Sequence, residues 1–101
     1  GAEENSSCTT SIFELKSFFG WTESILITDE LNYELYSVLR DDKSFLPFMI
    51  SSGLHQKTID HFVMRQIKLQ GIRSIFIAST PLLAQKLLKS FASNSIDVGY
   101  S

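Results

Sequence analysis

Few residues of this chain have the types and spacings that catalysis or metal binding requires. His55 and His61 are six positions apart, whereas two metal ligands on one helix face stand four apart. We therefore predict that both histidines are solvated residues on a helix surface. Cys8 is distant from both histidines in the sequence, which disfavours a cysteine–histidine nucleophile pair. Asp41-Asp42 lack a third acidic ligand, which favours a turn over a magnesium site. The pattern predicts a protein that is not an enzyme and that holds no metal and no cofactor.

A more promising position is the turn formed by Ser51, Ser52, Gly53 and Leu54. It follows an apolar run and precedes an amphipathic stretch, which is typical of a strand-to-helix turn. Loops at strand ends present their groups on a rigid scaffold, so we expect this turn to be the functional surface. A structural alternative stays open, because one of the two serines could simply cap the following helix.

The composition sets the size of the fold that must position this turn. The chain has 101 residues, of which 44% are apolar and 20% charged, with a formal net charge of -2. These values predict one domain with one modest core and exclude intrinsic disorder. The mild acidity predicts no nucleic-acid partner, which would need a basic face. A single cysteine indicates a reducing, cytoplasmic setting. The chain has no run of 18 apolar residues, the length that a membrane-spanning helix needs.

Residues 1–10 are small and polar and are interpreted as a flexible leader, so that a single domain spans residues 11–101. From residue 11 to 18, apolar and charged residues alternate as in a strand with one buried face. The aromatic residues around this segment are expected in the core. If they are exposed instead, Phe19 and Trp21 mark a partner surface.

The middle of the chain predicts two strands and one helix. Ile25 to Ile27 form a short buried run, and Phe45 to Ile50 form a second run in which Pro47 restricts the strand to a sheet edge. Between the two runs, apolar residues recur at helical spacing, which predicts a helix with a buried stripe. The members of this stripe are Leu31, Leu35, Val38 and Leu39.

The second half of the chain predicts two helices around a strand. A helix of about four turns ends at Gly71, and Ile75 to Ala78 form an apolar strand. Thr80-Pro81 then supplies an N-cap hydroxyl and a proline at the first helical position. The following helix has a buried stripe and ends at Asn94-Ser95, before a closing strand over residues 96–100. The stripe comprises Leu83, Ala84, Leu87, Leu88 and Phe91. Interleaved strands and helices indicate an α/β fold.

Several consecutive segments resemble the STAS family, named for sulfate transporters and anti-sigma factor antagonists. Residues 46–55, LPFMISSGLH, are similar to the strand and D-S/T-S/T-G-L signature of that family, although Ile50 stands where the family has aspartate. Gly71 resembles the exit of the helix after the signature, and residues 81–91 resemble the last helix. Phe18-Phe19-Gly20 is similar to the F-F-G-N stretch of sulfate permease domains, with Trp21 in place of the asparagine.

The resemblance implies a STAS-like sandwich, with a mixed sheet of about four to five strands and about three to four helices. It implies a non-catalytic cytosolic domain that regulates a sulfate-permease-type anion transporter and binds a protein partner. The membrane spans would then lie outside this chain, and the domain would lie at the inner face of the membrane. The alternative is a free-standing partner-switch protein, similar to an anti-sigma factor antagonist. In some members of the family, a serine or threonine of the signature is phosphorylated to release the partner, and Ser51 matches that position. Because Ile50 replaces the family's aspartate, capping is favoured over phosphorylation at Ser51.

Overall fold

Three strands form a parallel sheet in the computed structural model, which describes residue 14, residues 23–71 and residues 74–96. They are β1 (Ser24–Thr28), β2 (Phe45–Met49) and β3 (Ser74–Ala78), in the order β2-β1-β3. Ile25 of β1 lies opposite Leu46 on one side and Ile75 on the other. Because β1 is central, all five of its residues are buried. The predicted buried strand around residues 25–27 is confirmed.

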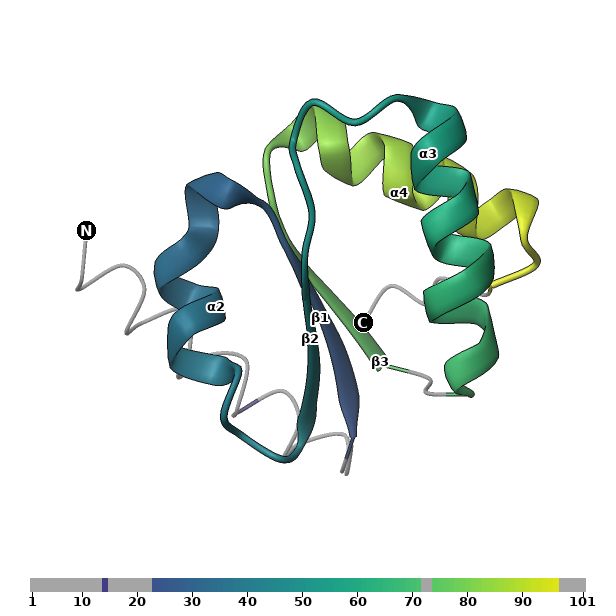
Figure 1. Cartoon of the computed structure of the whole chain (residues 1–101). Coiled ribbons are helices and arrows are strands. Elements are labelled where there is room, and N and C mark those ends of the chain that lie inside the picture. The colour runs from purple at the N-terminus through teal and green to yellow at the C-terminus, as the bar shows by residue number, and fades with distance from the viewer. Residues whose placement is uncertain (1–13, 15–22, 72–73, 97–101) are drawn as a thin grey trace.

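Helices cover both faces of this sheet, as Figure 1 shows. In chain order these elements are η1 (Glu30–Asn32), α2 (Tyr33–Leu39), α3 (Gln56–Phe62), η2 (Val63–Ile67), η3 (Lys68–Gln70) and α4 (Pro81–Ser93). One face carries the 3-10 turn η1 and the short helix α2. The other face carries α3 and α4, and α3 continues directly into the π-helical turn η2 and the 3-10 turn η3. The α/β class predicted from the sequence is therefore correct.

The predicted mixed sheet of four to five strands is not what the described residues form. They form three strands, all parallel. Of the strand predicted over residues 11–18, only Glu14 is described, and it is helical and exposed. Of the strand predicted over residues 96–100, only Ile96 is described, and it lies in no strand. The remaining residues of these two predicted strands lie outside the described residues.

The two sheet faces bury two separate clusters. Ile25 and Ile27 face α3, η2 and α4, where they pack with Ile59, Val63 and Leu87. Leu26 points to the opposite face and packs with residues of α2 and with Phe45. Successive strand residues point to opposite faces, so one apolar strand supplies both clusters.

Two residues of the apolar stripe predicted before β2 are exposed rather than buried. Leu35 and Leu39 are buried on α2, but Leu31 is 72% exposed and Val38 is 60% exposed. Leu31 belongs to the 3-10 turn η1, whose tighter winding removes it from the α-helical spacing. Val38 precedes the buried Leu39 by one position, which places it about 100° around the helix.

The long helix predicted to end at Gly71 is confirmed. Gly71 has a left-handed conformation with φ of 69°, which glycine adopts without steric cost. The π-helical segment η2 was not predicted. Ile59, Val63 and Ile67 are all buried at intervals of four, a spacing that drifts around a regular α-helix. The wider π turn compensates for that drift and returns Ile67 to the core.

Helix α4 buries Leu83, Leu87 and Phe91 against the sheet, as predicted. Thr80 is its N-cap and Pro81 its first residue, but the Thr80 hydroxyl makes no cap hydrogen bond. That part of the prediction was wrong. At the other end, Ser95 adopts a positive φ of 59°, and the Ile96 N–H donates to the Phe91 carbonyl at 2.8 Å. This closure is a Schellman motif.

Strand β2 lies at the edge of the described three-stranded sheet, as Pro47 predicted. The Ile50 N–H donates to the Thr28 carbonyl of β1 at 2.8 Å. Backbone groups alternate in direction along a strand, so position 47 faces away from β1. The N–H that proline lacks is therefore not needed for pairing with β1.

Candidate functional site

Three loops meet at one edge of the sheet, because the carboxyl ends of parallel strands lie together. They follow β1 at residues 29–32, β2 at residues 50–55 and β3 at residues 79–80. In open α/β sheets this edge is the usual location of binding sites.

Asp29 connects the first loop to the third. It is fully buried directly after β1. Its Oδ1 atom accepts hydrogen bonds from the Leu31 N–H, the Asn32 N–H and the Asn32 Nδ2, at 3.1, 3.1 and 2.7 Å. Its Oδ2 atom accepts from the Thr80 N–H at 2.7 Å. One carboxylate therefore caps η1 and fixes the start of α4.

Glu30 connects the first loop to the second. Its Oε2 atom accepts from the Ser52 N–H at 2.9 Å, and its Oε1 atom accepts from the Ser52 hydroxyl. Both bonds lower the pKa of the Glu30 carboxyl below its ordinary value, and the bond from the Ser52 hydroxyl has the larger effect. We call this two-bond contact the Glu30–Ser52 latch. Glu30 is exposed, so the latch lies at the protein surface.

The other predicted residues of this turn have different surroundings. Ser51 is exposed, and its hydroxyl accepts a hydrogen bond from the Gly53 N–H at 3.3 Å. Leu54 packs against the core, and its carbonyl accepts from the Lys86 Nζ at 3.0 Å. The turn is thus anchored at Ser52 and Leu54, while the Ser51 side chain faces solvent.

Capping of α3 by one of these serines is contradicted. The N-cap of α3 is His55, and no side chain caps the helix there. The two serines bond elsewhere: the Ser51 hydroxyl accepts from the Gly53 N–H, and the Ser52 N–H donates to Glu30. Sequence spacing alone did not reveal that the helix begins only at Gln56.

The other candidate residues are placed as follows. His61 lies exposed on α3, and His55 is exposed at its N-cap, so both are surface residues as predicted. Asp42 belongs to a turn, where its Oδ1 atom accepts from the Ser44 N–H at 2.8 Å. Phe19 and Trp21, the predicted partner surface, lie outside the described residues.

Sequence reasoning missed Asp29 and Glu30 as site residues. A signal was present, because an acidic pair follows the apolar run Ile25 to Ile27 after a single threonine. In a parallel sheet such a position faces the loops of neighbouring strands. The Asp29–Thr80 and Glu30–Ser52 hydrogen bonds could not be inferred before the strand order was known.

The contacts of Asp29 and Glu30 fix the three loops of this edge, and the Ser51 hydroxyl is left exposed. Both Asp29 oxygens bind donors of the chain itself, so this carboxylate serves as a structural connector. Within residues 23–71 and 74–96, no three metal-binding side chains of the Asp, Glu, His or Cys type are grouped closely enough to hold an ion. In the same ranges, no helix is long and apolar enough to cross a membrane.

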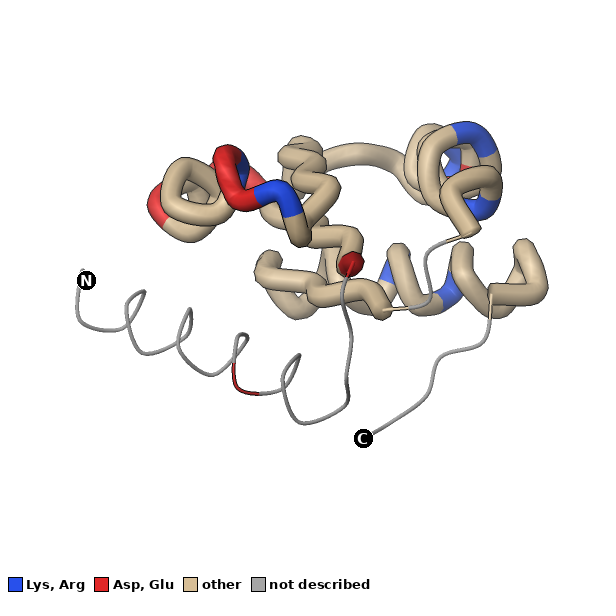
Figure 2. The backbone as a smooth tube through the Cα atoms, turned by 90° about the horizontal axis from the view of Figure 1, so that it is seen from below, with Lys and Arg blue, Asp and Glu red and all other residues tan. Residues whose placement is uncertain are grey.

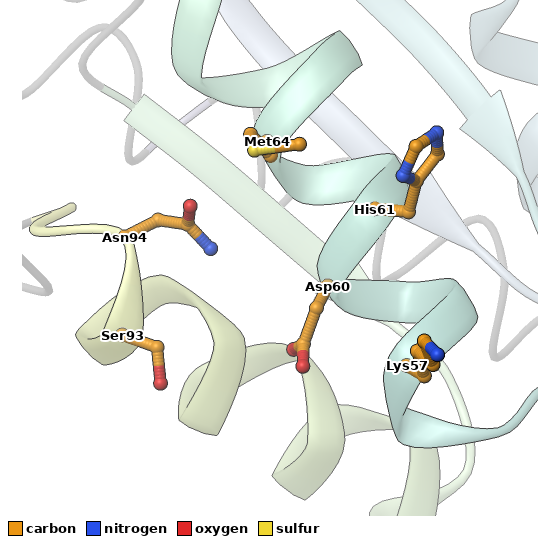
Figure 3. A pocket seen from close by; sticks show the side chains of 6 residues that line it. All are labelled: Lys57, Asp60, His61, Met64, Ser93 and Asn94. Carbon is orange, nitrogen blue, oxygen red and sulfur yellow. The ribbon is translucent and has the colours of Figure 1, made fainter.

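A hollow of about 280 Å³ lies away from this edge, between α3 and α4. Figure 3 shows Asp60 pointing from α3 toward α4, whereas His61 points away from α4. Hydrogen bonds from Gln56 and Ser90 hold the pKa of Asp60 below its ordinary value, so this carboxyl stays ionised near neutral pH. Lys57 also lines the hollow, so a cationic and an anionic side chain both border it.

Comparison of the chain with protein-family models, with curated proteins and with solved structures found no match in any of the three.

Proposed function

We propose that this chain is a STAS-like, non-catalytic regulatory domain of a sulfate-permease-type anion transporter, located at the cytosolic face of the membrane. Its working surface is the turn Ser51–Leu54, through which it binds a protein partner. The observation that carries this proposal is the anchoring of that turn. The Glu30–Ser52 latch and the Lys86–Leu54 bond hold a signature-like sequence in one conformation while the Ser51 side chain stays exposed.

The same geometry supports a regulatory role for Ser51. A phosphate group on its hydroxyl would add about -1.5 to -2 charges at neutral pH. The neighbouring residue Ser52 is bonded to the Glu30 carboxylate, so the added charge would lie close to an existing negative charge. Repulsion between like charges would weaken the latch and change the shape of the turn. A partner that recognises the anchored turn would then dissociate.

A non-catalytic role is supported by how the polar groups of this edge are used. The Asp29 oxygens accept hydrogen bonds from backbone and side-chain donors of adjacent loops, and the Glu30 oxygens accept from Ser52. A general base must instead reach a proton of the reacting group. These carboxylates are suited to positioning the turn.

A free-standing partner-switch protein would use the same turn and the same exposed Ser51 hydroxyl. The two candidates differ in what surrounds this chain in the full-length gene product. A series of apolar helices of about 20 residues each ahead of this domain supports the transporter. A start codon near Ala2 supports the partner-switch protein.

The test of the working surface is a comparison of Ser51→Asp with wild type. Proteins captured by the wild-type chain are identified and then titrated against each form. We expect Ser51→Asp to weaken binding at least tenfold, or about 1.4 kcal/mol, while the chain stays folded. Ser95→Asp is the matched control, because Ser95 is an exposed serine at the end of α4. Equal affinities for wild type and Ser51→Asp would rule out the switch at this turn.

A further inference from the structure

The small net charge of the chain conceals a strong separation of charge. Among the described residues, 23–55 contain six acidic and two basic side chains, whereas 56–71 and 74–96 contain five basic side chains and one acidic, Asp60. Figure 2 shows most of the acidic positions on the α2 side and most of the basic positions on the α3 and α4 side. A protein with this arrangement has an oriented electrostatic field, even though its total charge is only -2.

The basic residues of the α3 side form a stripe along one helical segment. Lys57, His61, Arg65 and Lys68 follow one another at intervals of four, four and three, and all four are exposed. We call them the α3 stripe. They lie opposite the side of the same segment that buries Ile59 in the core. In the part of the chain that the structure describes, none of the four forms an ion pair with an acidic side chain.

Apolar side chains accompany the α3 stripe. Met64 is 46% exposed and Leu69 is 78% exposed on the same segment. Exposed apolar residues among cations are typical of helices that lie on an anionic membrane surface. A nucleic acid would use the cations but not the apolar side chains, because its affinity depends chiefly on phosphate contacts.

One end of the stripe borders the hollow between α3 and α4, because Lys57 and His61 line it together with Asp60. Figure 3 shows Asp60 pointing toward α4 and His61 pointing away from α4. Arg65 and Lys68 are exposed and do not line the hollow, so they are available to a flat surface. A flat lipid surface can contact exposed cations and apolar side chains along the length of such a segment. The acidic α2 layer then faces away from the anionic lipids.

We propose that the α3 stripe docks against an anionic lipid surface, with Arg65 and Lys68 near the lipid headgroups and Leu69 at the boundary with the acyl chains. The inference rests on the proposed function, which places this domain beside a membrane. Each cation near such a surface contributes severalfold in binding constant. A few cations bind weakly in isolation, so attachment to a membrane-embedded protein would increase occupancy by raising the effective concentration.

The test measures sedimentation of the full chain with vesicles. One set contains phosphatidylcholine only, and the other contains about 30% phosphatidylserine. We expect wild type to sediment with the phosphatidylserine vesicles at low salt, and to be released as salt screens the charges. Arg65→Glu combined with Lys68→Glu should reduce the bound fraction at limiting lipid at least tenfold. Arg40→Glu combined with Lys43→Glu is the matched control, because it makes the same charge change at two exposed positions of the α2 side.

Three results would overturn the lipid proposal. The first is no sedimentation of wild type at millimolar lipid, and the second is equal sedimentation of the two double variants. The third is retention of wild type on immobilised polyglutamate without vesicle binding, which would assign the stripe to an acidic protein. Circular dichroism confirms that each variant is folded. Ser51→Asp should leave vesicle binding unchanged, so failure here is distinguishable from failure of the proposed turn function.

Discussion

The Oδ2 atom of Asp29 accepts a hydrogen bond of 2.7 Å from the backbone N–H of Thr80, which lies 51 positions further along the chain. Asp29 directly follows the central strand, and Thr80 is the N-cap of α4. The bond therefore ties the carboxyl end of β1 to the helix that covers the larger core cluster. Because Asp29 also caps η1, its side chain connects two of the three loops of the candidate site by hydrogen bonds.

Replacement of this connector should destabilise the fold. In Asp29→Asn one oxygen becomes an amide NH₂ group, so a donor would face either the Thr80 N–H or the donors of η1. A buried donor without an acceptor costs about 1 to 3 kcal/mol. We expect urea denaturation to show a loss of that size, whereas Asp41→Asn, at an exposed position, should have little effect. A loss below about 0.5 kcal/mol would mean that the Asp29 charge is not important for the loops.

The Glu30–Ser52 latch predicts a defined pH dependence. The pKa of Glu30 is lowered by the Ser52 hydroxyl and the Ser52 N–H, so the folded state binds its proton less readily than the unfolded state. The resulting stabilisation is present above the ordinary glutamate pKa, about 4.3, and is lost as the pH falls through the lowered value.

NMR titration of the Glu30 side chain can test this relationship. In Ser52→Ala the hydroxyl bond is lost, and the pKa should rise toward its ordinary value while the backbone bond remains. Ser51→Ala is the control, since the Ser51 hydroxyl bonds to Gly53 instead. The same Glu30 pKa in wild type and Ser52→Ala would show that the latch is open in solution.

Helix α4 should depend strongly on Leu87. This side chain is fully buried against the sheet, so Leu87→Ala should cost about 2 to 5 kcal/mol in the free energy of unfolding. Leu82→Ala in the same helix is the control, because Leu82 is 58% exposed. Chemical denaturation of both variants gives the comparison. Equal losses in the two would contradict the packing of α4 described here.

The end of α4 offers a stabilising substitution. Ser95 has a φ of 59°, a conformation that costs energy for residues with a Cβ atom and little for glycine. We expect Ser95→Gly to raise the free energy of unfolding by about 0.5 to 1 kcal/mol. Ser93→Gly lies inside the helix and should lower it. Thermal unfolding of the two variants should shift in opposite directions, and a lower melting temperature for Ser95→Gly would refute the closure.

The sequence by itself determined the elements whose evidence is local. Ile25 to Ile27 are a continuous apolar run, and Leu83, Leu87 and Phe91 repeat at helical spacing, so both elements were predicted correctly. Gly71 was predicted as a helix end because left-handed backbone strongly favours glycine. In each case the physical cause acts within a few residues, which is the range that periodicity reports.

Only the tertiary structure decided which residues meet. The Asp29–Thr80 and Glu30–Ser52 contacts join residues 51 and 22 positions apart, and they exist because the three strands are parallel and β1 is central. Strand pairing and strand order are long-range choices, for which local periodicity carries no information.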